Sequence, residues 1–170
     1  MKRHENLVTF ESMLIGYTDA VARVEAGTGD PTTTYVSLFE ALNWAVALDD
    51  RVGAHWVPDV EPVGFEWLAR LGHGAELMAG VRFARNRVHH QWCDAITVER
   101  NLRGEFKNWV WIARDELPPP DKPDPNGEAV YRSELEGRPI IVCLNVLNGA
   151  FYTLAGWLEP HTLRQTSPRA

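Results

Sequence analysis

The sequence has 170 residues, of which 45% are hydrophobic and 24% are charged, and its formal net charge is −6. This length fits a single domain with a core of its own, which we place over residues 1–170. The negative balance argues against a protein that coats nucleic acid by charge alone, although it is compatible with a local basic cleft.

Two helices are predicted in the first third of the chain. Apolar side chains recur every three or four positions over residues 7–25, which is the period of an amphipathic helix. Asp30 and Pro31 form a cap-and-start signal for a second helix, which we expect to run to about Asp49. A connector with a glycine and two prolines covers residues 50–62.

A third, longer helix is predicted from about residue 64 to about residue 98, with an apolar stripe that extends to Trp92. Beyond it, residues 108–114 alternate in the manner of a strand, and residues 129–135 suit a returning strand. The proline-rich residues 117–127 are expected to form a loop without helix potential. Together they predict a small hairpin inserted at about 105–136.

The last helix is expected to open at Gly137-Arg138-Pro139 and to reach about Leu158, followed by a flexible tail at about 160–170. Its apolar stretch is interrupted by polar residues and glycines, which favours a buried helix over a membrane span. The predicted fold class is therefore mainly α: a bundle of four to five helices with a small β-hairpin insertion before the last helix. Trp109 and Trp111 either pack the hairpin onto this bundle or offer a surface on which bases stack.

The cysteines Cys93 and Cys143 match no metal or redox spacing, so we expect reduced core thiols and a cytoplasmic protein. No signal peptide is expected, because no apolar run of signal length follows the basic N-terminus. No histidine or carboxylate set has convincing metal-ligand spacing, so neither a metal nor another cofactor is predicted.

Residues 85–90 read RNRVHH, which concentrates cationic and imidazole side chains within two helical turns. Helical residues three and four positions apart are neighbours. One polar surface is therefore expected to carry Arg82, Arg85, Asn86, His89 and His90. A solvated basic face is the simplest interpretation of this surface, and residue types alone leave it open.

The spacing of an arginine, a polar residue, three further residues and a histidine resembles the signature of the HEPN family. Arg85, Asn86 and His90 occupy the signature positions, on the third of four predicted helices. The family is a bundle of four to five helices, and the resemblance covers the outline of the fold from about residue 7 to about residue 158.

This resemblance implies a metal-independent endoribonuclease, of the toxin or defence-effector kind, acting as a homodimer on RNA with an antitoxin protein as a candidate partner. His90 would transfer protons, Arg85 would clamp the phosphate, and Asn86 would orient the imidazole or hold a phosphate oxygen. Further contacts to the substrate would come from Arg82, Arg87 and His89.

Two features depart from the family pattern or compete with it. Family members that are silenced by nucleotidylation carry a tyrosine two positions after the histidine, where this chain has Trp92. His89 competes with His90, because Arg82 and His89 fit a looser form of the spacing. Asp49 and Asp50 either approach the cleft and orient an imidazole or face solvent.

Two other classes of function remain open. The same polar surface would suit a non-catalytic helical module that binds RNA, a nucleotide or a protein partner. A purely structural dimer is the other alternative, with the apolar helix at residues 138–158 as its interface.

Overall fold

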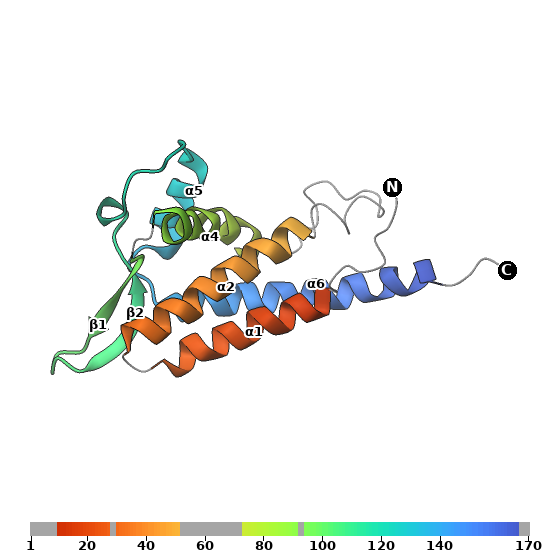
Figure 1. Ribbon diagram of the computed structural model, residues 1–170, viewed down its shortest axis with the longest axis horizontal. Coiled ribbons are helices and arrows are strands. Elements are labelled where there is room, and N and C mark those ends of the chain that lie inside the picture. Colours follow the sequence, from red (N-terminus) through yellow and green to blue (C-terminus); the bar gives the residue numbers. More distant parts are fainter. Residues whose placement is uncertain (1–9, 28–29, 52–72, 92–93, 167–170) are drawn as a thin grey trace.

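The computed structural model describes residues 10–27, 30–51, 73–91 and 94–166 (Figure 1). The four main helices are α1 (Phe10–Ala26), α2 (Pro31–Arg51), α4 (His73–His90) and α6 (Ile140–Thr166). Between α4 and α6 come strands β1 (Ile96–Arg100) and β2 (Phe106–Trp111), the 3-10 turn η2 (Arg114–Glu116), helix α5 (Pro125–Val130) and the π-helical turn η3 (Tyr131–Leu135). The predicted fold class, mainly helical with a small two-stranded sheet, is confirmed at this level. Residues 50 and 51 of the predicted connector belong to α2, and the rest of the connector and the first part of the third predicted helix lie outside the described residues.

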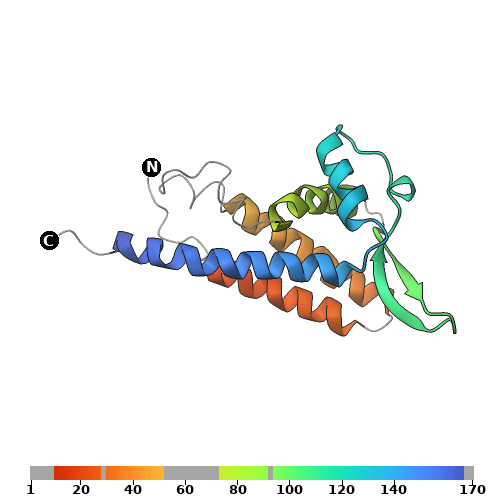
Figure 2. The same cartoon turned by 180° about the vertical axis from the view of Figure 1, so that it is seen from behind.

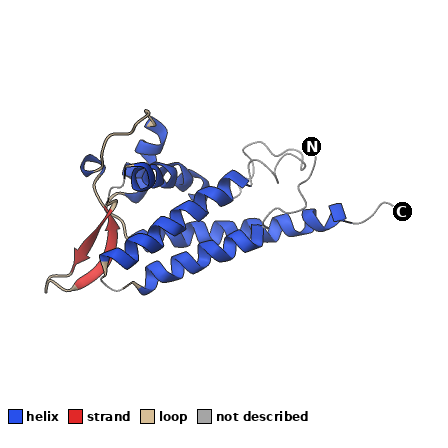
Figure 3. Cartoon of the chain, viewed as in Figure 1, coloured by secondary structure: helices blue, strands red, loops and turns tan. Residues whose placement is uncertain are grey.

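Helices α1, α2 and α6 run side by side, while α4 crosses beside α2, and the two strands project from one end of the bundle (Figures 1, 2 and 3). Leucine, valine, alanine and aromatic side chains from all four main helices form one buried core. Tyr17 joins α1 to α6, because its hydroxyl donates to the Leu144 carbonyl at 2.7 Å and its ring meets the Phe151 ring edge-on. Cys143 is buried in the same core, and burial raises the pKa of its thiol to about 12.

The start of α2 follows the predicted signal. The Asp30 carboxylate accepts hydrogen bonds from the Thr32 and Thr33 amides at 3.2 Å each, and also from the Thr33 hydroxyl. The hydroxyl of Thr33, followed by the two amides, lowers the pKa of Asp30. An ionised carboxylate at this position satisfies the free N–H groups of the first turn and complements the helix dipole.

The predicted hairpin is wrong in its pairing. Strand β1, whose residues 96–98 we assigned to the end of the third helix, pairs antiparallel with β2, with Ile96 opposite Trp111. The β-branched residues Thr97 and Val98 suit an extended chain once α4 has ended at His90. Trp109 and Trp111 are buried, and the Trp109 indole donates to the Gly27 carbonyl at 3.2 Å, so these two rings pack the hairpin onto the bundle.

Residues 129–135, which we predicted to form a returning strand, are helical. Asp124 caps α5 by accepting from the Gly127 amide at 2.9 Å, with Pro125 in the first turn. This is the same Asp-Pro start signal that opens α2, and it lies inside the segment that we predicted to lack helix potential. The following turn buries Tyr131 and Leu135 against the core.

Helix α6 continues to Thr166, eight residues beyond the predicted end at about Leu158. Leu163, Arg164 and Gln165 are good helix formers and extend the helix past Pro160. Among the helices of the described residues, none combines the length and the apolar content needed to cross a bilayer.

Candidate functional site

The polar side chains of α4 meet α2 along a line that we call the α2–α4 seam. It comprises Phe39, Asn43, Asp49 and Asp50 of α2, together with Arg82, Arg85 and His89 of α4. Contacts along the seam run in opposite directions on the two helices: His89 meets Phe39, Arg85 meets Asn43, and Arg82 meets Asp49 and Asp50. The two helices therefore run in opposite directions where they meet, and each α4 residue of the seam has its own partner on α2.

Arg82 is bound by two carboxylates. Its Nε lies 3.1 Å from Asp49 Oδ2, and its Nη2 lies 2.6 Å from Asp50 Oδ1 and also contacts Asp49. Burial acts to lower the pKa of Arg82, but the hydrogen bonds and negative charges of Asp49 and Asp50 outweigh burial and raise it. The positive charge of Arg82 is thus matched within the chain. The two aspartates orient this arginine and not an imidazole.

Arg85 is held by neutral groups instead. Its Nε donates to Asn43 Oδ1 at 3.0 Å, and its Nη1 donates to Asn86 Oδ1 at 3.3 Å. Among the described residues, no carboxylate forms an ion pair with Arg85. The Arg85 side chain is partly exposed to solvent.

His89 lies near Arg85, whereas His90 contacts His89, and the two histidines have different surroundings. His89 packs against the Phe39 ring at 5.3 Å and against the His90 ring at 4.8 Å, measured between ring centres. Its Nδ1 is buried without a hydrogen-bond partner among the described residues. Burial, followed by the positive charges of Arg85 and His90, lowers the pKa of His89. His89 therefore favours the neutral, proton-accepting form, whereas the His90 side chain is exposed to solvent.

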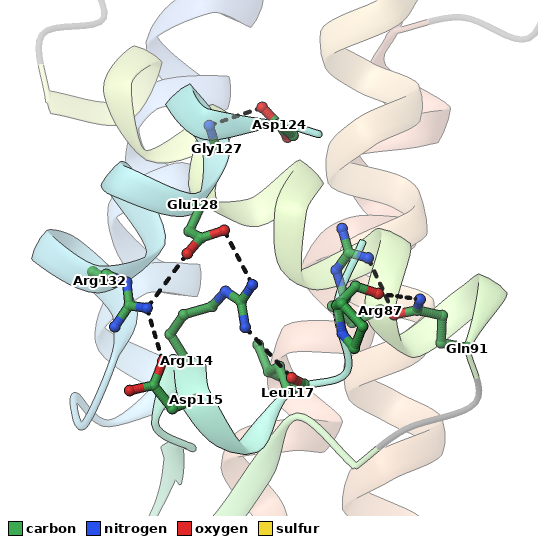
Figure 4. Close-up of polar contacts among 10 residues, drawn as sticks. Arg87, Gln91, Arg114, Asp115, Leu117, Asp124, Gly127, Glu128 and Arg132 are labelled. Carbon is green, nitrogen blue, oxygen red and sulfur yellow. Dashed lines mark hydrogen bonds and ion pairs between the residues drawn. The ribbon is translucent and has the colours of Figure 1, made fainter. Parts of the chain in front are cut away.

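Arg87 is the predicted site residue that the structure places elsewhere. It is only 4% exposed, its guanidinium lies over the Phe83 ring, and its Nη1 donates to Gln91 Oε1 at 3.1 Å (Figure 4). Gln91 in turn donates to the Pro119 carbonyl at 2.6 Å. Arg87 thus belongs to the packed side of α4, away from the solvent-facing groups of the seam. The structure brings together Arg82, Arg85, Asn86, His89 and His90.

The sequence places Phe39 on the apolar face of the second helix and indicates no role for Asn43. Each acquires its place in the seam from a partner on α4. The one available signal was an asparagine in the middle of the apolar second helix, where this residue is an unfavourable choice. Trp92, on which the comparison with nucleotidylated relatives depends, lies outside the described residues. Within the described residues, no group of three or more histidines, cysteines or acidic side chains could hold a metal ion.

Fold and site together show a mainly helical protein with a seam between α2 and α4 that carries arginine and imidazole side chains. Comparisons of the chain with family models, with curated proteins and with solved structures gave no match. The function therefore has to be inferred from the chemistry of the seam itself.

Proposed function

We propose that this protein is a HEPN-like, metal-independent endoribonuclease that acts as a homodimer. The observation that carries the proposal is the contrast between two arginines of one helix. Arg82 is matched by two aspartates. Among the described residues, the partners of Arg85 are amides, and Arg85 lies near the His89 imidazole, which packs against His90. A cation without a matching anion favours a site that receives a negatively charged group such as a phosphodiester.

The reaction would be an internal transesterification. An imidazole takes the proton of the 2′-hydroxyl as the 2′-oxygen attacks phosphorus. The bond from phosphorus to the 5′-oxygen breaks, and a second imidazole gives that oxygen a proton. The products are a 2′,3′-cyclic phosphate and a 5′-hydroxyl, so the atoms balance without water or metal. The Arg85 guanidinium would stabilise the charge that builds on the non-bridging oxygens.

In this proposal His90 is the principal imidazole, because it is exposed on the last turn of α4 and can reach a bound strand. A symmetric homodimer would bring two copies of Arg85 and His90 to one cleft, so that one imidazole accepts a proton while the other donates one. The doubled charge would also allow a chain of net charge −6 to bind RNA locally. A toxin or defence effector, paired with an antitoxin protein in the cytoplasm, is the biological setting that the HEPN resemblance implies.

Cleavage of single-stranded RNA in EDTA tests the proposal directly. The parent protein should yield 2′,3′-cyclic phosphate ends. Arg85→Ala and His90→Ala should each slow cleavage by roughly 10²–10⁴-fold, the range for loss of a phosphate-stabilising donor or an acid-base group. Arg132→Ala is a matched control, because it removes an exposed arginine remote in sequence from the seam. Circular dichroism should show all three variants folded.

Two results would overturn the assignment. One is a His90→Ala variant that cleaves as fast as the parent. The other is RNA binding that weakens with salt but is never followed by cleavage at any pH, which would identify a non-catalytic helical module.

A further inference from the structure

Asn43 is the α2 residue that holds Arg85 in place. Its Oδ1 accepts the Nε–H of Arg85 at 3.0 Å, while its own Nδ2 donates to the Phe39 carbonyl one turn earlier at 2.8 Å. The second bond sets the orientation of the amide, because a nitrogen occupied with a carbonyl leaves the oxygen toward the guanidinium. We infer that Asn43 is the positioning residue of the phosphate-binding arginine, an inference that rests on the proposed nuclease function.

This arrangement fixes the direction of the guanidinium plane. An arginine held at Nε keeps its two Nη groups as a planar fork, which is the geometry that binds two oxygens of a phosphate. Asn86 supplies a second, longer contact at Nη1. Phe39 lies one turn before Asn43 on α2 and packs against His89. Two successive turns of α2 therefore position both the arginine and an imidazole of α4.

The amide also determines the charge of the site. An aspartate at position 43 would offer the same oxygen to Nε but would cancel the charge of Arg85, as Asp49 and Asp50 do for Arg82. An amide holds the arginine and leaves its charge available for an anion. The amide at position 43 thus leaves Arg85 able to bind a substrate anion, whereas the carboxylates of Asp49 and Asp50 restrict Arg82 to stabilising the fold.

Two substitutions of Asn43 separate its effect on the position of Arg85 from its effect on the charge of the site. Asn43→Ala removes the acceptor and keeps the charge of Arg85 available, whereas Asn43→Asp keeps the acceptor and adds a matching anion. Alanine and aspartate are both tolerated in helices, with aspartate the weaker helix former, so thermal unfolding should show both variants folded. Asp50→Asn is the matched control, because it changes a carboxyl group to an amide on the same helix beside the other arginine.

Three measurements are made on each protein. The first is the NMR signal of the Arg85 Nε–H and its exchange with solvent. The second is the affinity for a 2′-O-methyl RNA oligonucleotide, which has phosphates but cannot be cleaved through its 2′-oxygen. The third is the steady-state cleavage of unmodified RNA.

For Asn43→Ala, the Arg85 Nε–H should exchange faster with solvent, and kcat should fall by roughly 10–100-fold with a smaller change in KM, because the arginine is misplaced rather than lost. For Asn43→Asp, the Nε–H should stay protected while oligonucleotide affinity falls about tenfold or more. A residue with a merely structural role would not separate the two variants in this way. Asp50→Asn should leave the Arg85 signal unchanged.

Equal oligonucleotide affinity of Asn43→Asp and the parent would overturn the inference, as would an Arg85 signal that Asn43→Ala does not change. The proposed function fails separately, when the parent cleaves no RNA in EDTA. The NMR and oligonucleotide measurements still decide the role of Asn43 in that case, since neither depends on cleavage.

Discussion

The Arg87 guanidinium carbon lies 4.6 Å from the centre of the Phe83 ring, on the packed side of α4. Arg114 approaches the same ring at 5.5 Å, so one phenyl group contacts two cations. Arg114 also pairs with Glu128 at 3.1 Å, and Glu128 contacts Arg132, as Figure 4 shows. These contacts join α4 to the segment between β2 and α6, and they hold α4 in place independently of the α2–α4 seam.

Arg87→Ala is therefore expected to destabilise the fold. It removes a buried side chain that packs on Phe83 and bonds Gln91, so the free energy of unfolding should fall by roughly 2–4 kcal/mol. Urea unfolding measures this change. Arg132→Ala, at an exposed ion pair, should cost less than about 1 kcal/mol. A stable Arg87→Ala protein that had lost only RNA cleavage would contradict our assignment of Arg87 to the packed side.

Stability should depend on pH through His89. Burial, followed by the charges of Arg85 and His90, lowers its pKa below the ordinary value of 6.5 in the folded state. At a pH between the lowered pKa of the folded state and the ordinary pKa of the unfolded state, the unfolded chain binds the proton more readily. The free energy of unfolding therefore decreases as the pH falls through this range. Between about pH 7 and pH 5 the parent should lose more stability than His89→Gln, which cannot titrate there. Parallel pH profiles of melting temperature for the two proteins would show that the environment of His89 has no such effect.

Asp49→Asn should weaken the fold and strengthen RNA binding together. The Asp49 side chain is 14% exposed and bonds the Arg82 guanidinium, so its loss should cost roughly 1–3 kcal/mol of stability. It also leaves Arg82 with less matching charge, and oligonucleotide affinity at low salt should rise a few fold. Glu11→Gln, which removes the same charge from an exposed position on α1, is the control. An equal gain in affinity for both variants would indicate a general effect of net charge.

Two helical glycines should respond oppositely to alanine. A Cβ at Gly80 of α4 would lie 3.0 Å from a Leu135 methyl and 3.2 Å from the Tyr131 amide nitrogen, so Gly80→Ala should lower the melting temperature. A Cβ at Gly149 of α6 would meet nothing within 4 Å, so Gly149→Ala should stabilise by about 0.5–1 kcal/mol. Thermal unfolding of the two variants compares them directly. Stabilisation by Gly80→Ala would show that α5 and η3 can move away from α4.

Some of the fold could be predicted from the sequence because its causes are local. The apolar period of α1 and the Asp30-Pro31 cap of α2 are properties of neighbouring residues, and the structure confirms both helices. The strand at residues 96–100 could not be recognised in this way. Ile96 continues the apolar stripe of α4 in sequence, and only its pairing with Trp111 makes it part of a sheet.

In the candidate site, too, the local features could be predicted from the sequence and the contacts between distant residues could not. Helical geometry predicted that Arg82, Arg85, Asn86, His89 and His90 share a surface, because their spacing on α4 is local. It could not separate Arg82 from Arg85, since that difference comes from aspartates and an asparagine 32 to 42 positions away. It also could not show that Arg87 is buried, because Phe83 and Gln91 hold it on a face that looks polar in sequence alone.

The bond from Tyr17 to the Leu144 carbonyl spans 127 positions and has a consequence for synthesis on the ribosome. The groups of the α2–α4 seam lie between residues 39 and 89, whereas α1, which packs against α2, meets α6 only once residues 140–166 have been made. Long-range contacts form late, and N-terminal segments wait for them with apolar surface exposed. A nascent chain can thus bring the groups of the seam together before its core is closed, and a chaperone that covers the apolar face of α1 toward α6 would act in that interval.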